Sequence, residues 1–101
     1  MRLEVRPWDE SGELAVDALR ARLEREGYSV FCWTDPPAAH YDAHAHDHDE
    51  SIWLVSGKIT FGTASGALAL EPGDRLMLPA GTVHTADAGS GGATYLIGER
   101  R

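Results

Sequence analysis

The densest group of chemically active side chains is the segment from His40 to Glu50, which reads HYDAHAHDHDE. Four of the five histidines of the chain lie in it, together with three aspartates and one glutamate. Imidazole nitrogens and carboxylate oxygens are good ligands for Fe, Mn, Co, Ni, Cu or Zn. The segment is therefore either a metal-binding element or an acidic surface loop that happens to contain histidines.

The spacing of the side chains favours the metal-binding interpretation. Alternate residues of a strand point to one face, so His44 and His46 should project in the same direction. Glu50 returns to that face if the chain turns at residues 47–49. Three ligands from one hairpin would leave one side of a metal unfilled. His84, the fifth histidine, lies at the start of a later predicted strand, just after a Pro-x-Gly turn.

The remaining polar residues of the segment are not expected to bind the metal. His48 falls in the expected turn and should face solvent, and His40 is not expected to be a ligand. Three aspartates should form a solvated rim, namely Asp42, Asp47 and Asp49. Aromatic side chains at strand spacing lie in the core more often than in a pocket. Four such residues are expected to line either the core or the pocket: Tyr41, Trp33, Trp53 and Phe61.

The first quarter of the chain predicts one amphipathic helix over Ser11 to Gly27. Apolar residues recur there at intervals of three and four. Asp9 or Ser11 could cap the helix, Glu13 would lie in its first turn, and Gly27 would end it. The helix should pack against a sheet or cover an open barrel end, and it carries no candidate functional residue.

From Tyr28 onward the pattern is that of short strands separated by Gly- and Pro-containing turns. Turns are expected around Asp35-Pro36-Pro37, at Gly57, and over 63–66, 72–73, 79–81 and 89–92. The expected strands are Tyr28–Trp33, Ile52–Val55, Lys58–Gly62, Ala67–Leu70, Arg75–Leu78, Val83–Ala86 and Thr94–Ile97. Strands without intervening helices predict a sandwich or barrel rather than a parallel α/β sheet.

Two motifs make the chain resemble the cupin superfamily. The first, His-x-His followed by Glu and then Gly, is matched by His44, His46, Glu50 and Gly57. The second, Gly followed by Pro-x-Gly and then His, is matched by Gly73, Pro79, Gly81 and His84. The fifteen residues from Lys58 to Pro72 separate them. Ala38 and Ala88 stand where the family often has Gly and Asn, neither of which is a metal ligand.

The resemblance implies an all-β fold, the double-stranded β-helix or cupin jelly-roll barrel, with one N-terminal amphipathic α-helix. Residues 28–101 would form the barrel, and residues 1–27 an extension whose helix packs on it. The resemblance also implies a single divalent metal ion held by His44, His46, Glu50 and His84. Its identity is open among Fe, Mn, Ni, Co, Cu and Zn.

Small cupins with this ligand set include dioxygenases, isomerases, lyases and proteins without known turnover. We therefore expect a metal-dependent enzyme acting on a small oxygen-rich or anionic metabolite, or alternatively a non-catalytic module that binds or senses a small ligand or the metal. Glu50 is the candidate general base and Tyr41 the candidate proton donor. We expect two copies of the chain to form a homodimer, because open sheets leave unpaired edges that need cover.

Composition narrows the partners further. A net charge of −7 with nine scattered basic residues argues against nucleic acid. No apolar run reaches the length of a membrane span, and residues 1–10 do not resemble a signal peptide. We therefore expect a cytoplasmic protein that binds a small molecule. Cys32, the only cysteine, is expected to be a buried apolar residue.

Overall fold

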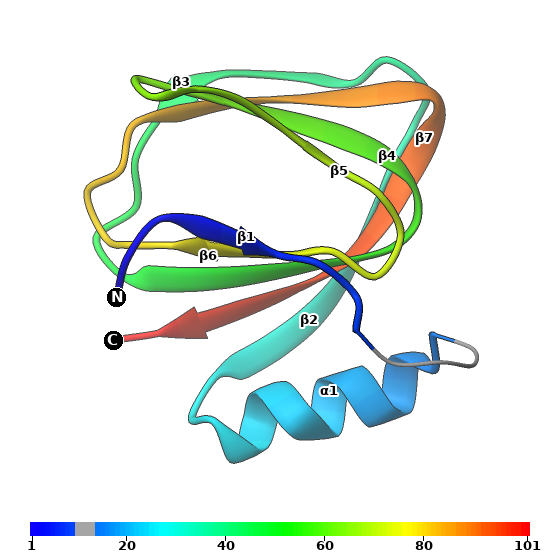
Figure 1. Cartoon of the computed structure of the whole chain (residues 1–101), viewed down its shortest axis with the longest axis vertical. Helices are drawn as coiled ribbons and strands as arrows, with labels where there is room; N and C mark the ends of the chain where they lie inside the picture. The colour runs from blue at the N-terminus through cyan, green and yellow to red at the C-terminus, as the bar shows by residue number, and fades with distance from the viewer. Residues whose placement is uncertain (10–13) are drawn as a thin grey trace.

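The computed structural model describes residues 1–9 and 14–101. Antiparallel strands build the molecule, and one helix lies outside them (Figure 1). The strands are β1 (Glu4–Arg6), β2 (Ser29–Asp35), β3 (His40–His44), β4 (Asp49–Thr63), β5 (Gly66–Leu70), β6 (Arg75–Leu78) and β7 (His84–Arg100), and the helix is α1 (Val16–Arg25).

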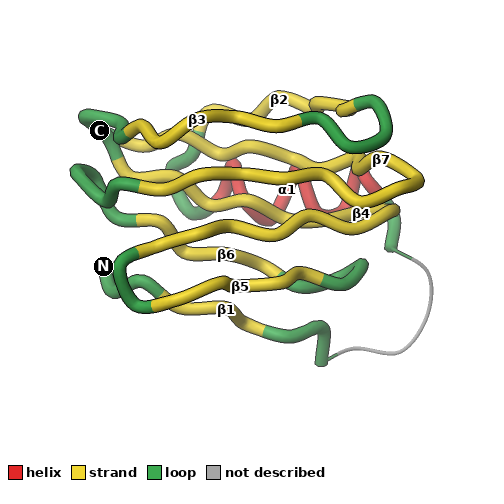
Figure 2. The backbone as a smooth tube through the Cα atoms, turned by 90° about the horizontal axis from the view of Figure 1, so that it is seen from above, coloured by secondary structure: helices red, strands yellow, loops and turns green. Residues whose placement is uncertain are grey.

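Two long strands, β4 and β7, organise the barrel. They pair with each other along most of their length, and the sheet runs in the order β1-β6-β4-β7-β2, with β3 added to β7 and β5 added to β4. Each long strand changes partner midway: β4 pairs first with β6 and then with β5, and β7 pairs first with β3 and then with β2. Both therefore curve from one layer to the other (Figure 1), and Figure 2 shows the strands side by side.

Glycines make this curvature possible. Gly57 in β4 has φ 79°, and Gly92 in β7 has φ 78°, a region that favours glycine. The two backbones approach so closely that a Cβ on Gly57 would lie 2.2 Å from the Gly92 carbonyl oxygen. The turns expected at Gly57 and over 89–92 are therefore wrong. These positions are bends inside continuous strands, with shifts of register beside Gly57.

The other strand predictions were closer. Arg75–Leu78 is confirmed, and the strands expected from Tyr28 and Ala67 are present with bounds shifted by one or two residues. Two strands were not expected, β1 and β3. β1 is a three-residue strand that pairs with β6, and it is too short to show an alternating pattern.

The helix is shorter than expected. It begins at Val16, its N-cap is Ala15 without a side-chain hydrogen bond, and Asp9 is not its cap. Ser11 and Glu13 lie outside the described residues. The predicted end at Gly27 is confirmed: Gly27 has φ 95°, and the amides of Gly27 and Tyr28 donate to the carbonyls of Glu24 and Leu23. This is the Schellman arrangement in which glycine ends a helix.

Two hydrophobic clusters divide the interior. One fills the space between the layers of the barrel and includes Leu54, Ile59 and Leu78. The other holds α1 against the outer face of the sheet, where Leu19 and Leu23 pack with residues of β4 and β7, Trp53 and Leu96 among them. Burying a leucine contributes about 1.5–3 kcal/mol. The helix is thus a stabilising element on the outside of the barrel, away from the open end.

An ion pair ties this helix to the sheet. The buried guanidinium of Arg75 donates to both carboxylate oxygens of Glu26, at 2.6 and 3.2 Å, and to the hydroxyl of Ser51 at 2.6 Å. It also lies over the ring of Trp53, at 4.9 Å from the centroid.

The described part of the chain contains no helix with the length and apolar character needed to cross a bilayer.

Candidate metal centre

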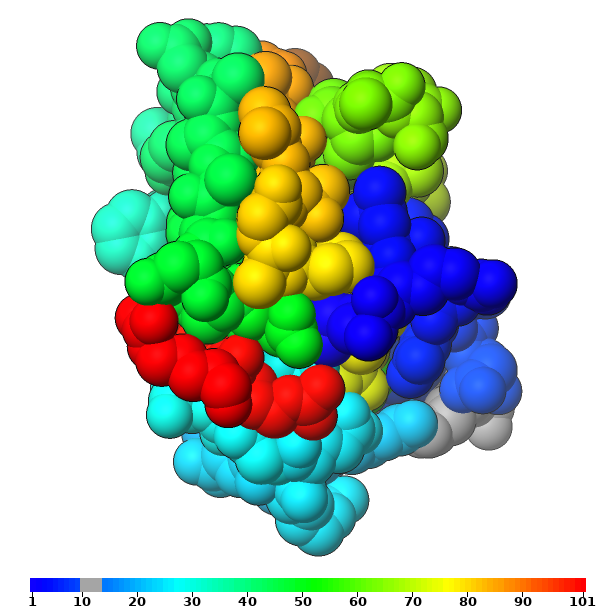
Figure 3. All heavy atoms as spheres, turned by 90° about the vertical axis from the view of Figure 1, so that its left-hand side faces the viewer, coloured from blue at the N-terminus to red at the C-terminus, as the bar shows by residue number. Residues whose placement is uncertain are grey.

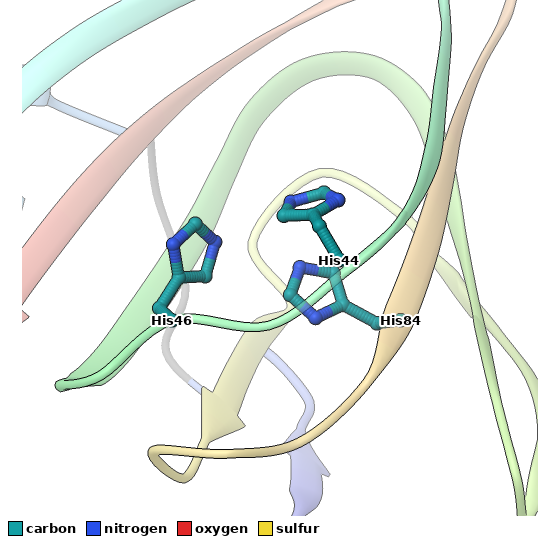
Figure 4. Close-up of side chains that lie close together, drawn as sticks. All are labelled: His44, His46 and His84. Atoms are coloured by element: carbon teal, nitrogen blue, oxygen red, sulfur yellow. The ribbon is translucent and has the colours of Figure 1, made fainter.

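Three histidines from two distant segments meet at one end of the barrel (Figure 4). His44 ends β3 and is the register partner of His84, which begins β7. His46 lies in the loop between β3 and β4. The ring centroids are 4.4 Å apart for His44 and His84, 5.0 Å for His44 and His46, and 5.3 Å for His46 and His84. One ring nitrogen from each of the three lies within 4.8 Å of the others, so this cluster could hold a metal ion.

The loop that carries His46 is fixed to the turn before β7. The amide of Gly81 donates to the carbonyl of His46 at 2.8 Å, and the amide of Ala80 donates to Asp49 at 2.9 Å. Gly81 has φ 81°, as its position in a tight turn requires. Figure 3 shows the two segments lying against each other at this face, green beside yellow and orange. The second motif therefore positions His84 and also supports the loop of the first.

Backbone carbonyls set the orientation of two of the rings. His44 Nδ1 lies 2.7 Å from the carbonyl oxygen of Asp42, and His84 Nδ1 lies 2.9 Å from that of Thr82. A carbonyl only accepts, so each Nδ1 carries the proton and each Nε2 is left with a free lone pair. Ligating histidines in proteins are held in this way by their second nitrogen. The donor set therefore fits a divalent transition metal.

The charge state of His84 agrees with this function. Burial lowers the pKa of His84 below its usual range, and the neighbouring rings of His44 and His46 lower it further, against the raising effect of the Thr82 carbonyl. The ring is consequently neutral at pH 7. Only the neutral ring can donate a lone pair to a metal.

Glu50 lies next to the three rings but is not part of their group. Its carboxylate is buried, with one oxygen 3.7 Å from His46 Nε2 and the other 3.0 Å from His48 Nε2. A second possible ligand group consists of His46, His48 and Glu50. The structure thus brings together three of the four residues expected to bind metal, and it places the fourth beside His46 with a hydrogen bond to His48.

His48 was expected to face solvent, and that expectation is wrong. The side chain is buried and lies between three carboxylates, those of Asp47, Glu50 and Glu99. Burial lowers the pKa of His48, but the hydrogen bonds to Asp47 and Glu50 outweigh it and raise the pKa overall. The chain bends at residues 47–48, but the ring stays buried because Glu99, near the end of β7, forms an ion pair with it. His48 lies two residues from His46 and two from Glu50, and this alternation is the sequence signal that would have placed it on their side of the strand.

His40 and its neighbours lie as expected, away from the cluster. His40 is exposed and bonds to Asp87 at 2.6 Å and to Asp42 at 3.0 Å, which together raise its pKa. Asp42 and Asp47 are solvated, whereas Asp49 accepts a backbone hydrogen bond. His40 therefore provides a matched control for the clustered histidines.

The histidines open into a cavity of about 270 Å³. Most of its wall is apolar or aromatic: Phe31, Trp33, Ile52, Phe61, Ala86 and Ile97. Tyr41, Tyr95, Glu50 and Glu99 supply the other polar groups. Trp53, in contrast, packs under the helix. Phe31 and Trp33 are 41% and 48% exposed, so no segment of residues 1–9 or 14–101 closes over them. A small molecule could therefore reach the imidazole nitrogens directly.

The sequence does not predict a buried carboxylate that lies behind this wall. The turn expected around Asp35-Pro36-Pro37 is present at residues 36–39. Asp35 itself ends β2, is 2% exposed, and accepts hydrogen bonds from Trp33 Nε1 at 2.8 Å, Tyr41 Oη at 2.5 Å and Tyr95 Oη at 2.6 Å. Its hydrogen bond raises the pKa of Tyr41. Burial, followed by the same carboxylate, raises that of Tyr95. Cys32, on the same strand, is exposed rather than buried.

Comparisons with known proteins identify the fold. No family model matches the chain, and no curated protein matches it by sequence. A cupin-2 domain protein of Shewanella frigidimarina is 20% identical, with a TM-score of 0.64 over 73% of this chain and 71% of that one. KdgF of Halomonas is 26% identical, with a TM-score of 0.62 over 73% and 70%.

A larger protein contains the same barrel. The ribosomal oxygenase YcfD of Escherichia coli, in complex with cobalt and succinic acid, is 21% identical, with a TM-score of 0.71 over 83% of this chain but only 27% of that one.

The chain therefore has the double-stranded β-helix fold of the cupins, which its two motifs predicted. Within that fold it is a small barrel with one outer helix and a histidine cluster able to hold a metal ion.

Proposed function

We propose that this cupin binds one divalent metal ion through His44, His46, His84 and Glu50, and that it is a metal-dependent enzyme of the dioxygenase, isomerase or lyase type. Its substrate would be a small oxygen-rich or anionic metabolite. The observation that carries the proposal is the convergence of three imidazoles at an open cavity, two of them with Nδ1 bonded to a backbone carbonyl. A cobalt-bound oxygenase with the same barrel supports it.

The residues of the chain have separate tasks in this proposal. A metal in such a site polarises an oxygen of a bound ligand and lowers the pKa of bound water. Two of the three rings are held by backbone carbonyls, so they would need little rearrangement to bind it. Glu50 is the candidate general base because its carboxylate lies beside the cluster, and it would act as a base on leaving the metal. Tyr41 is a weaker candidate proton donor, since its proton is already donated to Asp35 and its pKa is raised.

The alternative function is a non-catalytic module that binds or senses a small ligand or the metal. It is favoured by the open cavity, whose mouth carries the exposed Phe31 and Trp33. Enzymes often close a loop over the substrate to exclude water. A binding module has no such need.

Elemental analysis of protein purified without added metal or chelator tests the metal site and identifies the ion. We expect about one divalent ion per chain, lost in His44→Ala, His46→Ala and His84→Ala and retained in His40→Ala. Undiminished metal after the clustered residues and Glu50 are all replaced by alanine would refute the site. The two functions are then separated by dioxygen uptake of the Fe(II)-loaded protein with a panel of small acids and enediols. Absence of turnover with any metal would favour the binding module.

We propose further that the protein forms a homodimer in the cytoplasm and binds neither nucleic acid nor membranes. In the described part of the chain β2 pairs only with β7, so its other edge has no strand partner, although Arg20 of α1 donates to the carbonyl of Val30 there. A molar mass from light scattering would test the dimer. We also retain the division into an extension, 1–27, and a barrel, 28–101. Because β1 of the extension pairs with β6, we expect its removal to lower stability, which thermal unfolding would measure.

A further inference from the structure

A polar group lies at the cavity wall, and the proposed chemistry gives a role to only one of its members, Tyr41. It consists of Asp35, Trp33, Tyr41 and Tyr95, here called the Asp35 cluster. Both tyrosines and Trp33 line the same cavity as the three histidines, while Asp35 lies behind them at 2% exposure. In the described part of the chain Asp35 accepts from the two hydroxyls and the indole N–H, and no basic side chain bonds to it. Burying a charged carboxylate costs free energy, and its three hydrogen bonds offset that cost only while the donors stay in place.

The hydrogen-bond directions determine what the tyrosines can offer a ligand. Each hydroxyl has one proton, and each proton is donated to Asp35, at 2.5 Å from Tyr41 and 2.6 Å from Tyr95. Tyr41 also accepts from Trp33 Nε1 at 3.2 Å, which leaves it one lone pair. Both phenol oxygens can therefore accept a hydrogen bond from a ligand, but neither can donate one without breaking its bond to Asp35.

The charge of the cavity points to the same class of ligand. Among the described residues, no Lys or Arg side chain lines the cavity, whereas Glu50 and Glu99 do. An anionic group away from the metal would find no cation to pair with and would lie near carboxylates. The apolar side chains, Phe61 and Ile97 among them, instead suit an uncharged hydrocarbon or aromatic body.

We propose that the Asp35 cluster selects a neutral ligand whose hydroxyl donates a hydrogen bond to Tyr41 or Tyr95 while its apolar body fills the cavity beside the histidines. This inference rests on the proposed metal site and narrows its substrate class from oxygen-rich or anionic compounds to hydroxylated, uncharged ones. Sites built to bond a hydroxyl reject the analogue that lacks it, because their polar groups are then left unpaired.

Calorimetry with zinc-loaded protein tests the proposal, with zinc content measured first. The probes are catechol, resorcinol and hydroquinone, the dimethyl ether of each, which has no hydroxyl to donate, and succinate. We expect the tightest diphenol to bind wild type about tenfold more tightly than its ether and more tightly than succinate. Tyr41→Phe or Tyr95→Phe should reduce that preference to about threefold or less. Tyr28→Phe is the matched control, because its buried hydroxyl has no hydrogen-bond partner among the described residues and lies outside the cavity.

Several results would overturn the proposal: equal binding of diphenol and ether, an unchanged preference in both Phe variants, tighter binding of succinate, or no binding of any diphenol to zinc-loaded protein. If Tyr95→Phe does not fold, Tyr41→Phe carries the test, because Tyr41 lies at the exposed mouth. A protein that takes up no zinc refutes the metal site instead. Repeating the titrations on metal-free protein then decides the role of the tyrosines independently.

Discussion

His48 is the residue whose replacement best separates a metal ligand from a residue that positions one. It donates to one oxygen of the buried Glu50 carboxylate at 3.0 Å, and the other oxygen of that carboxylate faces His46 at 3.7 Å. His48→Ala removes this hydrogen bond while leaving the three clustered imidazoles in place. Glu50 is 5% exposed, so solvent does not readily replace the lost partner.

Two magnitudes follow from this geometry. Residues that orient a metal ligand typically account for about 10–100-fold in metal affinity, or about 1.4–2.8 kcal/mol. Leaving a buried acceptor without its partner costs about 1–3 kcal/mol, so a loss near 2 kcal/mol would lower the melting temperature of the metal-free protein by about 8–16 °C. We therefore expect His48→Ala to weaken metal binding by one to two orders of magnitude and to destabilise the metal-free protein.

Competition with a chromophoric chelator measures the affinity, and thermal unfolding of the metal-free protein measures the stability. His40→Ala is the matched control, since His40 also bonds to two carboxylates but is exposed and distant from the cluster. His48→Gln should recover part of the loss because an amide can donate to Glu50. Wild-type affinity in His48→Ala would refute the positioning function. A loss as large as that of His84→Ala would show that His48 is itself a ligand.

Three further predictions concern the scaffold. Gly57→Ala should lower the free energy of unfolding, measured in urea, by about 2–4 kcal/mol, because its Cβ would lie 2.2 Å from a carbonyl oxygen. The control is Gly81→Ala, which has the same sign of φ but open space around the Cβ and should lose about 1 kcal/mol. Equal losses in the two variants would contradict this prediction. Glu26→Gln should cost about 1–2 kcal/mol at pH 7, a value reduced for the partial exposure of Glu26. Hydrogen bonding to Arg75 lowers the pKa of Glu26 from 4.5, so the difference from wild type should shrink as the pH falls below 4.5, and a pH-independent difference would contradict it. Leu23→Ala should cost about 2–5 kcal/mol with unchanged metal affinity, which would fail if metal binding weakened in parallel.

The sequence predicted best what depends on local pattern or on motif spacing. The end of the helix at Gly27 follows from the conformational freedom of one residue, and Arg75–Leu78 from an apolar run between turn residues. The meeting of His84 with His44 and His46 was implied by the two motifs together, because no local rule connects residues forty positions apart. The cupin fold was predictable for the same reason.

What the sequence missed depends on contacts between distant strands. Gly57 and Gly92 signal turns when taken alone, but they allow two paired strands to bend together, and only the pairing distinguishes these cases. Asp35 stands before two prolines and therefore suggested a turn. Its burial depends on Tyr95, sixty residues away, and on Tyr41 from another strand. His48 was misplaced because Glu99, which receives it, comes from the far end of β7.

Anomalous diffraction from a crystal grown with cobalt measures the position of the ion itself. We predict one anomalous peak per chain at the mouth of the cavity, about 2.1 Å from the Nε2 atoms of His44, His46 and His84, with Nδ1 of His44 and His84 still bonded to backbone carbonyls. A peak on the His46, His48 and Glu50 side alone, coordination through Nδ1, or no peak at a saturating cobalt concentration would contradict the account.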